Sequence, residues 1–138
     1  MIRISGKPFL EHQIELFKKN RIFDVVLCVG FLGKQIEKYF GDGKRFGVSI
    51  KYSREKEPVD TGTTLKNAKK LLRDEFFVIY GDSYLLNDYR KAYDYFKKFN
   101  KSGLMTIYKN YEKLEPNTVI AEGNLIKKFD KKNPISTG

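Results

Sequence analysis

The chain has 138 residues, of which 41% are hydrophobic, with 27 Lys and Arg against 17 Asp and Glu, one Cys and no Trp. This length and apolar content suffice for one domain with a real core, and the apolar residues fall in tight runs, which excludes disorder for most of the chain. The formal net charge of +10 is spread over both halves and comes mostly from lysine. This pattern favours a solvated lysine surface over a nucleic-acid groove, because base and phosphate readers favour arginine.

The sequence shows no targeting or membrane-spanning segment. Its longest apolar stretch, residues 25–32, is far shorter than the roughly 20 residues that a membrane-spanning helix needs. The first residues lack the basic start, apolar stretch and cleavage site of a secretory signal. We therefore expect a cytoplasmic protein that binds no membrane. The single cysteine, Cys28, is expected to be a small buried side chain, and one His with one Cys excludes a zinc site.

Hydrophobic spacing predicts an alternation of helices and strands. In chain order, the predicted elements are a helix at residues 8–19, a strand at 24–30, a helix at 32–40, a strand at 46–52, a helix at 61–72, a buried strand at 76–80, a helix at 87–99, and strands at 104–108, 118–121 and 125–129. A turn at residues 122–124 is predicted to join the last two strands as a hairpin. The alternation indicates a three-layer α/β domain with a mostly parallel sheet, although the chain opens with a helix where such a domain normally opens with a strand.

In open α/β sheets, ligands bind beyond the carboxyl ends of the strands. Asp82 directly follows the predicted strand 76–80, between Gly81 and the hydroxyl of Ser83. A carboxylate in this place can hold a hard divalent cation whose other ligands are water and phosphate. It could equally cap the next helix or a turn, since Asp and Ser are common there.

The loop at residues 55–64 is a second candidate, because it leads into a helix whose N-terminus offers free backbone N–H groups to an acceptor. Asp60 or Thr61 could equally be the N-cap of that helix. No Gly-x-Gly-x-x-Gly or Walker-type phosphate loop occurs in the sequence.

Several segments, taken in order and spacing, resemble those of the sugar-phosphate nucleotidyltransferases. They are GKPFLEHQI at 6–14, DVVLCVGFLG at 24–33, YFGDG at 39–43 with Phe46-Gly47-Val48, Glu57-Pro58 with Thr61-Gly62, LKNA at 65–68, and FVIYGDS at 77–83. The resemblance is nearest to the branch that uses mannose- or heptose-1-phosphate. It implies a Rossmann-like nucleotide-diphospho-sugar transferase fold. It also implies a reaction in which a sugar-1-phosphate and a nucleoside triphosphate, with Mg²⁺, give an NDP-sugar and pyrophosphate.

The resemblance implies roles for individual residues. Asp82 matches the aspartate that binds the metal, and Thr61 and Gly62 match the loop that approaches the nucleobase. Lys131 falls near the lysine that contacts the sugar phosphate. Asp60 replaces a glycine of the family's Leu-Gly-Thr-Gly-Gly-Ala loop. Its charge could weaken nucleotide binding, or its carboxylate could accept from the N–H edge of guanine.

The family's pattern also contains a first strand, a glycine-rich loop ending in Thr-Arg, a following Pro-Lys and a second metal-binding aspartate, and none of these is matched in this sequence. We therefore expect residues 1–138 to be a partial nucleotidyltransferase domain with little or no turnover by itself, in which no catalytic residue can be assigned. One alternative is a non-catalytic nucleotide- or sugar-binding module on the same fold, which could pair with another subunit as an oligomer. The other is RNA binding through the lysines, which predicts steep salt dependence.

Overall fold

The computed structural model describes residues 1–109, 118–130 and 133, and the chain divides into two units, residues 1–90 and 91–138. The elements are β1 (Arg3–Ile4), β2 (Lys7–Pro8), α1 (Phe9–Lys19), β3 (Asp24–Val29), α2 (Gly33–Phe40), η1 (Lys44–Phe46), β4 (Ser49–Arg54), α3 (Thr61–Ala68), η2 (Lys69–Leu71), α4 (Tyr89–Phe99), β5 (Val119–Glu122) and β6 (Leu125–Phe129). The short antiparallel hairpin β1–β2 precedes α1, so the prediction that the chain opens with a helix is wrong.

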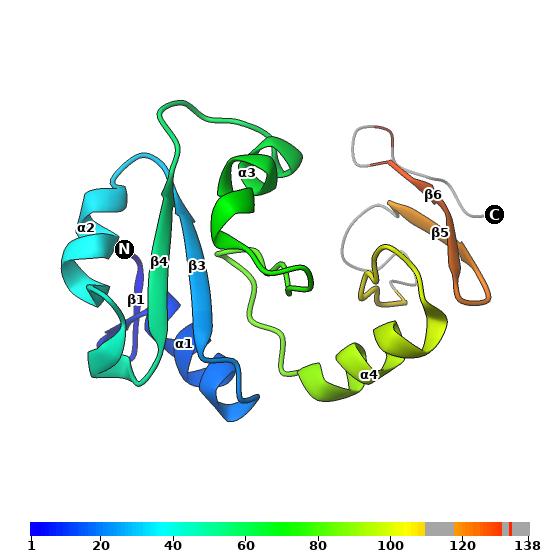
Figure 1. The fold of residues 1–138 in the computed structure, drawn as a ribbon, viewed down its shortest axis with the longest axis horizontal. Coiled ribbons are helices and arrows are strands. Elements are labelled where there is room, and N and C mark those ends of the chain that lie inside the picture. The colour runs from blue at the N-terminus through cyan, green and yellow to red at the C-terminus, as the bar shows by residue number, and fades with distance from the viewer. Residues whose placement is uncertain (110–117, 131–132, 134–138) are drawn as a thin grey trace. The chain divides into compact units, whose positions relative to one another are not determined.

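The first unit is built around a parallel pair of strands, β3 and β4, which lie side by side in Figure 1. The register runs from Asp24 opposite Ser49 to Val29 opposite Arg54. Parallel strands cannot be joined by a tight turn, and α2 with η1 supplies the longer connection that they need. The predicted alternation of strand, helix and strand is therefore confirmed over residues 24–54.

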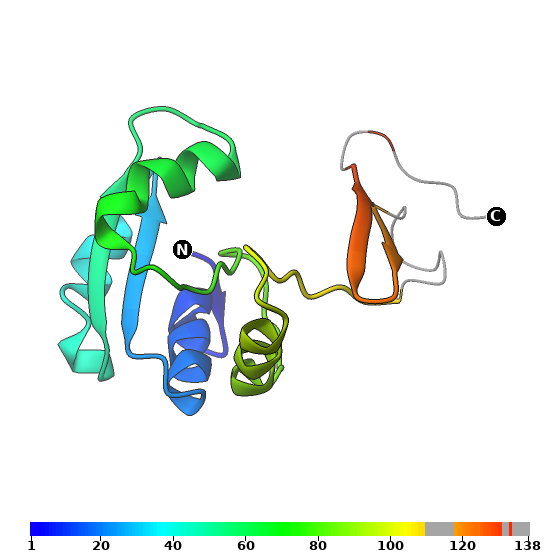
Figure 2. The ribbon, with the colours of Figure 1, turned by 45° about the vertical axis from the view of Figure 1, so that its right-hand side comes forward.

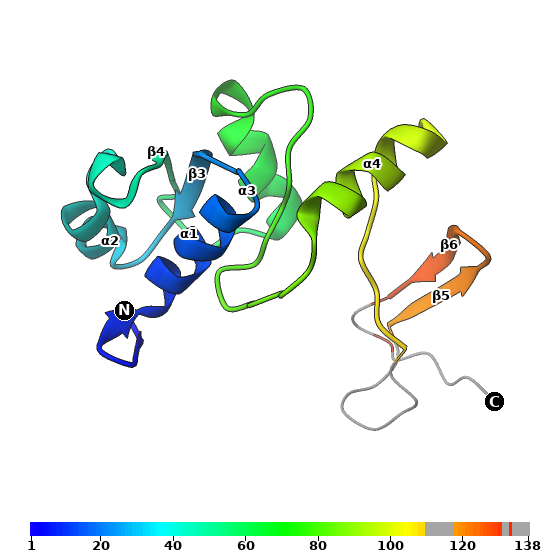
Figure 3. The same cartoon turned by 90° about the horizontal axis from the view of Figure 1, so that it is seen from below.

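The core of this unit lies where α1 and α2 pack against one face of the strand pair. Its buried apolar members come from α1, α2 and the region of β4, and they are Ile14, Phe17, Phe40, Val48 and Ile50. The apolar side chains of α1 recur at helical spacing, so one stripe of that helix is buried while the rest faces water. Figures 1 and 3 show α3 on the opposite side of the two strands from α2.

Cys28 is exposed, which corrects the expectation of a buried thiol. Successive side chains of a strand point to opposite faces, so Cys28 lies on the face opposite to Leu27, which packs against the core. Partial burial and, to a smaller extent, the Glu55 carboxylate raise the pKa of the Cys28 thiol above its ordinary value. The reactive thiolate is therefore a minor form near neutral pH.

The predicted strands at 76–80 and 104–108 are wrong, because neither segment forms a strand in the structure. Four of the five side chains in the first segment are about half exposed: Phe76 48%, Phe77 42%, Val78 50% and Tyr80 49%. Only Ile79 packs against the core. An apolar run becomes a buried strand only where neighbouring strands pair with it, and within the described residues β3 pairs with β4 alone.

The second unit contains most of α4 and the antiparallel hairpin β5–β6, whose two strands are seen together in Figure 2. Gly123 has a φ of +57° in the connecting turn, a conformation that glycine adopts without a steric penalty. The predicted turn at residues 122–124 is thus confirmed. Among the described residues, no helix combines the length and the apolar character needed to cross a bilayer.

Candidate functional site

Asp60 is the N-cap of α3. Its Oδ1 accepts hydrogen bonds from the backbone N–H groups of Gly62 (2.9 Å) and Thr63 (3.1 Å), and its Oδ2 accepts from the Thr63 hydroxyl (2.7 Å). These bonds satisfy backbone donors that the first turn of any helix leaves without intrahelical partners. The Thr63 hydroxyl and then the backbone N–H groups hold the pKa of the Asp60 carboxyl below its ordinary value. The capping role that the sequence left open is therefore confirmed for Asp60.

The capped turn determines what Thr61 and Gly62 can offer a ligand. Both residues are exposed in the first turn of α3. A Cβ added to Gly62 would lie 3.1 Å from Asp60 Oδ1, so the cap itself favours glycine at this position. The Asp60 charge also compensates the positive end of the helix dipole. As a result, the N-terminus of α3 attracts anions less than an uncapped helix would, and Asp60, Thr61 and Gly62 stay together as one exposed corner.

Asp82 lies at the tip of a four-residue turn. The N–H of Ser83 donates to the carbonyl of Tyr80 at 3.1 Å, which closes a β-turn over residues 80–83. The Asp82 carboxylate is exposed, and the Ser83 hydroxyl lies 3.4 Å from its Oδ1, beyond the range of an ordinary O–H···O bond. No ion pair to Asp82 occurs in the part of the chain that the structure describes. Its oxygens thus remain available to a cation.

The surroundings of Asp82 decide which cation it suits. Among the described residues there is no group of three or more His, Cys, Asp or Glu side chains that could enclose a metal ion. Mg²⁺ does not need such a group, because it is commonly bound through one or two carboxylates together with water and substrate phosphates. The donor set at this turn therefore fits a Mg²⁺ ion that arrives with a phosphate ligand, and it does not fit a metal held by protein ligands alone.

Gln13 is the contributor to this region that sequence reasoning missed. The residue is 2% exposed, and its side chain donates from Nε2 to the carbonyls of Tyr80 (3.0 Å) and Ser83 (2.7 Å). In the predicted helix at 8–19, Gln13 falls in the same stripe as the apolar residues Leu10, Ile14 and Phe17. A polar residue in an apolar stripe was the one available signal, since a buried amide needs hydrogen-bond partners.

Lys131, expected to contact the sugar phosphate, lies outside the described residues. The structure describes its surroundings only up to Asp130 and at Asn133. The Asp130 carboxylate accepts from the backbone N–H of Asn133 (2.9 Å) and from its side-chain amide (3.2 Å). The role of Lys131 remains a prediction.

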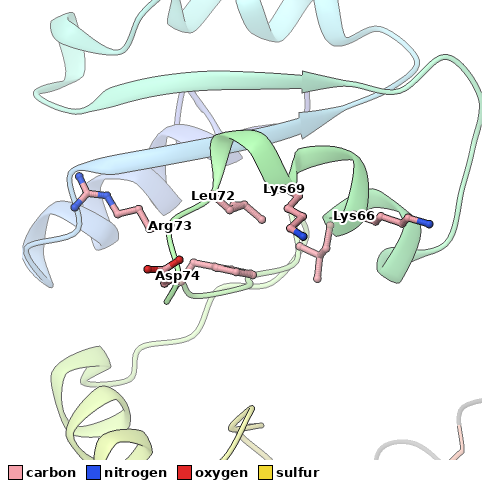
Figure 4. Close-up of a pocket in the computed structure, with 7 residues that line it drawn as sticks. Lys66, Lys69, Leu72, Arg73 and Asp74 are labelled. Carbon is pink, nitrogen blue, oxygen red and sulfur yellow. The ribbon is translucent and has the colours of Figure 1, made fainter.

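A pocket of about 330 Å³ lies beside α3 and η2, and Figure 4 shows its lining. It is lined by Leu65, Lys66, Lys69, Leu72, Arg73, Asp74 and Phe76. In Figure 4 Arg73 reaches toward the start of β3, where it forms an ion pair with Asp24. None of the residues predicted to bind nucleotide or metal lines this pocket, so it is separate from the candidate site.

Comparison with known proteins assigns the family. The family model described as "Nucleotidyl transferase" matches residues 1–129. The chain therefore belongs to the nucleotidyl transferase family, in agreement with the resemblance found in its motifs.

The relatives include several sugar-1-phosphate guanylyltransferases. The chain is 35% identical over 134 residues to D-glycero-alpha-D-manno-heptose 1-phosphate guanylyltransferase of Campylobacter jejuni, covering 96% of this chain and 58% of the relative. It is 34% identical over 140 residues to the enzyme of the same name from Aneurinibacillus thermoaerophilus, covering 100% of this chain and 60% of the relative. It is 30% identical over 141 residues to the mannose-1-phosphate guanylyltransferase catalytic subunit beta of Xenopus tropicalis, covering 98% and 39%.

A solved structure supports the fold. The crystal structure of HddC from Yersinia pseudotuberculosis matches with a TM-score of 0.65 and 30% sequence identity, over 70% of this chain and 43% of that one. Over the matched part of this chain, the mixed α/β fold is thus similar to the fold of that protein. The chain spans about 60% of the length of the heptose 1-phosphate guanylyltransferases it matches, at 58% and 60%.

Proposed function

We propose that the protein containing this chain transfers a nucleotidyl group from a nucleoside triphosphate to a sugar-1-phosphate and releases pyrophosphate. GTP is the first candidate donor and a heptose-1-phosphate the first candidate acceptor, because the two relatives at 34% and 35% identity are named for that pair. The observation that carries the proposal is the Asp82 turn. An exposed carboxylate with no ion pair among the described residues stands in the loop where the family resemblance expects a metal ligand.

The proposed chemistry is an in-line displacement. A phosphate oxygen of the sugar-1-phosphate attacks the α-phosphorus of the nucleotide. One P–O bond forms there, and the bond from the α-phosphorus to the oxygen bridging toward the β-phosphate breaks, so pyrophosphate leaves with that electron pair. When bound, Mg²⁺ supplies charge neutralisation at the phosphates. The protein contributes mainly by positioning the reactants.

Each candidate residue has one task in this scheme. The Asp82 carboxylate would hold Mg²⁺, and the exposed corner at Thr61 and Gly62 would lie against the nucleobase. Asp60 keeps that corner folded through its three hydrogen bonds. Lys131 would contact the sugar phosphate. The loop that carries Asp60 is thus proposed to shape the nucleotide site, with its carboxylate oxygens already engaged by the protein.

We further propose that residues 1–138 are a partial domain of a three-layer, mostly parallel α/β fold. The sequence contains no glycine-rich loop ending in Thr-Arg, and in this family such a loop is expected to hold the triphosphate. The Asp82 turn and the corner at Thr61 and Gly62 are present, so the chain by itself is expected to bind a magnesium nucleotide. Without the loop that holds the triphosphate, it is expected to show little turnover.

Two assays on the 138-residue chain test the proposal. Calorimetric titration with GTP, CTP, UTP and ATP, each with and without Mg²⁺, should show Mg²⁺-dependent binding that is strongest for GTP. A pyrophosphate-release assay with GTP, Mg²⁺ and either a heptose- or a mannose-1-phosphate should show little or no turnover. Release at an ordinary enzyme rate, about 1 s⁻¹ or faster, would contradict the partial-domain proposal. Equal binding of all polyanions with a steep salt dependence would favour the RNA-binding alternative instead.

A further inference from the structure

We propose that Gln13 is the positioning residue of the metal site: from α1, it fixes the turn that presents Asp82 to the cation. This inference rests on the proposed function, because it takes Asp82 as the ligand. It adds a residue from a distant part of the sequence. The two hydrogen bonds join Gln13 to residues 67 and 70 positions further along the chain.

The geometry joins one buried amide to both arms of the turn. Nε2 of Gln13 donates to the carbonyl of Tyr80 at 3.0 Å and to the carbonyl of Ser83 at 2.7 Å. Tyr80 and Ser83 are the first and fourth residues of the β-turn, and the Tyr80 carbonyl also accepts the turn's own hydrogen bond from the N–H of Ser83. An NH₂ group has two hydrogens to donate. Both are therefore used, and each holds one side of the segment whose tip is Asp82.

The chemistry at position 13 is specific to an amide donor. Ile14 and Phe17 on the same helix are core residues, and an apolar side chain would suit a 2% exposed site next to them. Such a side chain would leave the two carbonyls without this donor. A glutamate would instead direct carboxylate oxygens at carbonyl oxygens. Gln13 therefore supplies what the turn requires, at the cost of a polar group in the core.

A second amide, on the residue that caps the C-terminus of α1, provides a matched control. Asn20, at the end of the helix, accepts at Oδ1 from the N–H of Tyr89 (3.1 Å) and donates from Nδ2 to the carbonyl of Leu16 (3.0 Å). It therefore ties the first residue of α4 to α1 without bonding to residues 80–83. The two amides have the same chemistry and belong to α1 and its C-cap, but of the two only Gln13 reaches the turn that carries Asp82.

Fixing the turn matters because of the ion it is proposed to hold. Mg²⁺ demands near-ideal octahedral geometry, and a site with one protein carboxylate has no second protein ligand to correct a misplaced first one. Residues that hold a metal ligand in place typically change metal affinity by about 10–100-fold when they are replaced. We therefore expect the affinity for the cation to depend on Gln13.

The test compares Gln13→Met, Asn20→Ala and Asp82→Asn in the 138-residue chain. Mn²⁺, a Mg²⁺ substitute visible by electron paramagnetic resonance, is titrated with GTP present. Hydrogen exchange of the Ser83 amide reports the turn independently of any ligand. Gln13→Met should weaken Mn²⁺ binding about tenfold and speed Ser83 exchange about tenfold. Asn20→Ala should leave both within about twofold, even where it lowers the melting temperature. If Gln13→Met does not fold, Gln13→Asn, which is one methylene too short to reach both carbonyls, takes its place.

The outcomes separate this inference from the proposed function. If Gln13→Met changes neither readout beyond Asn20→Ala, the positioning role is overturned. If Ser83 exchange speeds up and Mn²⁺ affinity stays unchanged while Asp82→Asn weakens it, the proposed metal site stands and the inference about Gln13 is wrong. If Asp82→Asn also binds Mn²⁺ as the unchanged chain does, the metal site of the proposed function fails as well.

Discussion

Asp60 and Asp82 are two exposed carboxylates in two loops of the same unit, and their surroundings differ. Both oxygens of Asp60 accept hydrogen bonds from the first turn of α3. Asp82 is held at the tip of a turn whose backbone is fixed from α1, while among the described residues its own oxygens have only the long contact to the Ser83 hydroxyl. The Asp60 side chain therefore fixes the backbone at the start of α3. At Asp82 the side chain fixes nothing in the described part of the chain, and Gln13 fixes the backbone of the turn that presents it.

The difference teaches how to separate a structural carboxylate from a candidate ligand. A capping aspartate has its acceptors in use, which lowers its pKa and stabilises the helix. A ligand aspartate needs free acceptors on a fixed backbone. Residue type and position in a loop do not distinguish the two, whereas the hydrogen-bond partners do.

The largest expected effect is a loss of stability on replacing Ile14, and it tests whether the same core supports the loops of Asp60 and Asp82. Ile14 is 1% exposed at the centre of the core. Replacing it with Ala should lower the free energy of unfolding by about 2–5 kcal/mol, because buried contacts are lost and a cavity remains. Denaturant unfolding measures the loss, and hydrogen exchange should show faster exchange at both Thr63 and Ser83. Faster exchange at only one of them would mean that the loops rest on separate supports.

The next effect distinguishes the two carboxylates directly. Asp82→Asn should weaken Mn²⁺ binding in the presence of GTP by at least about 10–100-fold. This is the range expected when a metal site loses a residue that supports a ligand, and Asp82 is proposed to be the ligand itself. The melting temperature should barely change, because the Asp82 side chain contributes no strong contact in the described residues. The same titration on Asp60→Asn, in which the capping oxygen is kept, is the control. Equal losses in the two variants would remove the distinction between the loops.

A smaller effect is expected from removing the cap. Asp60→Ala should destabilise the first unit by about 1 kcal/mol, the usual cost of losing an N-cap. Asn caps nearly as well, so Asp60→Asn should retain most of that stability. Thermal unfolding of the three proteins at pH 7 measures the difference. A loss in Asp60→Ala no larger than in Asp60→Asn would show that the cap contributes little.

The smallest effect is the pH dependence of the cap. The folded chain holds the pKa of Asp60 below its ordinary value of 3.8. The unfolded chain therefore binds this proton first as the pH falls, and the stability contributed by the carboxylate is present above that value and is lost below it. The melting temperature of the unchanged chain should thus approach that of Asp60→Asn as the pH falls from 7 to 3. A constant difference over this range would contradict the assigned hydrogen bonds.

Local patterns sufficed to predict much of the fold. Three predictions rested on the preferences of neighbouring residues alone, and the structure confirms them. They are the helix from the apolar stripe of α1, the strand from the run at Val25–Val29 and the hairpin from the turn around Gly123. The segment at 76–80 was mispredicted because strand formation depends on hydrogen-bonded neighbours, which its composition cannot reveal. Cys28 was mispredicted because burial depends on which elements cover each face of β3.

The sequence indicates which residues are candidates for a site, and it does not reveal their contacts. The spacing of residues picks out Asp82, Asp60, Thr61 and Gly62, but it leaves cap and ligand as alternatives for both carboxylates. For Asp60 the structure shows a cap, because its carboxylate accepts hydrogen bonds from residues two and three positions away. The bonds of Gln13 reach 67 and 70 positions along the chain. Contacts of that kind become visible only when the folded chain brings distant segments together.

The most direct test of the account is the paramagnetic broadening of backbone amide signals in the ¹⁵N-labelled chain when Mn²⁺ is added with GTP, because broadening falls steeply with distance from the ion. The account predicts that the amides of Gly81, Asp82 and Ser83 broaden first and that Asp82→Asn abolishes this effect. Broadening that begins at Gly62 and Thr63 and persists in Asp82→Asn would contradict it, and would place the cation at the capped end of α3.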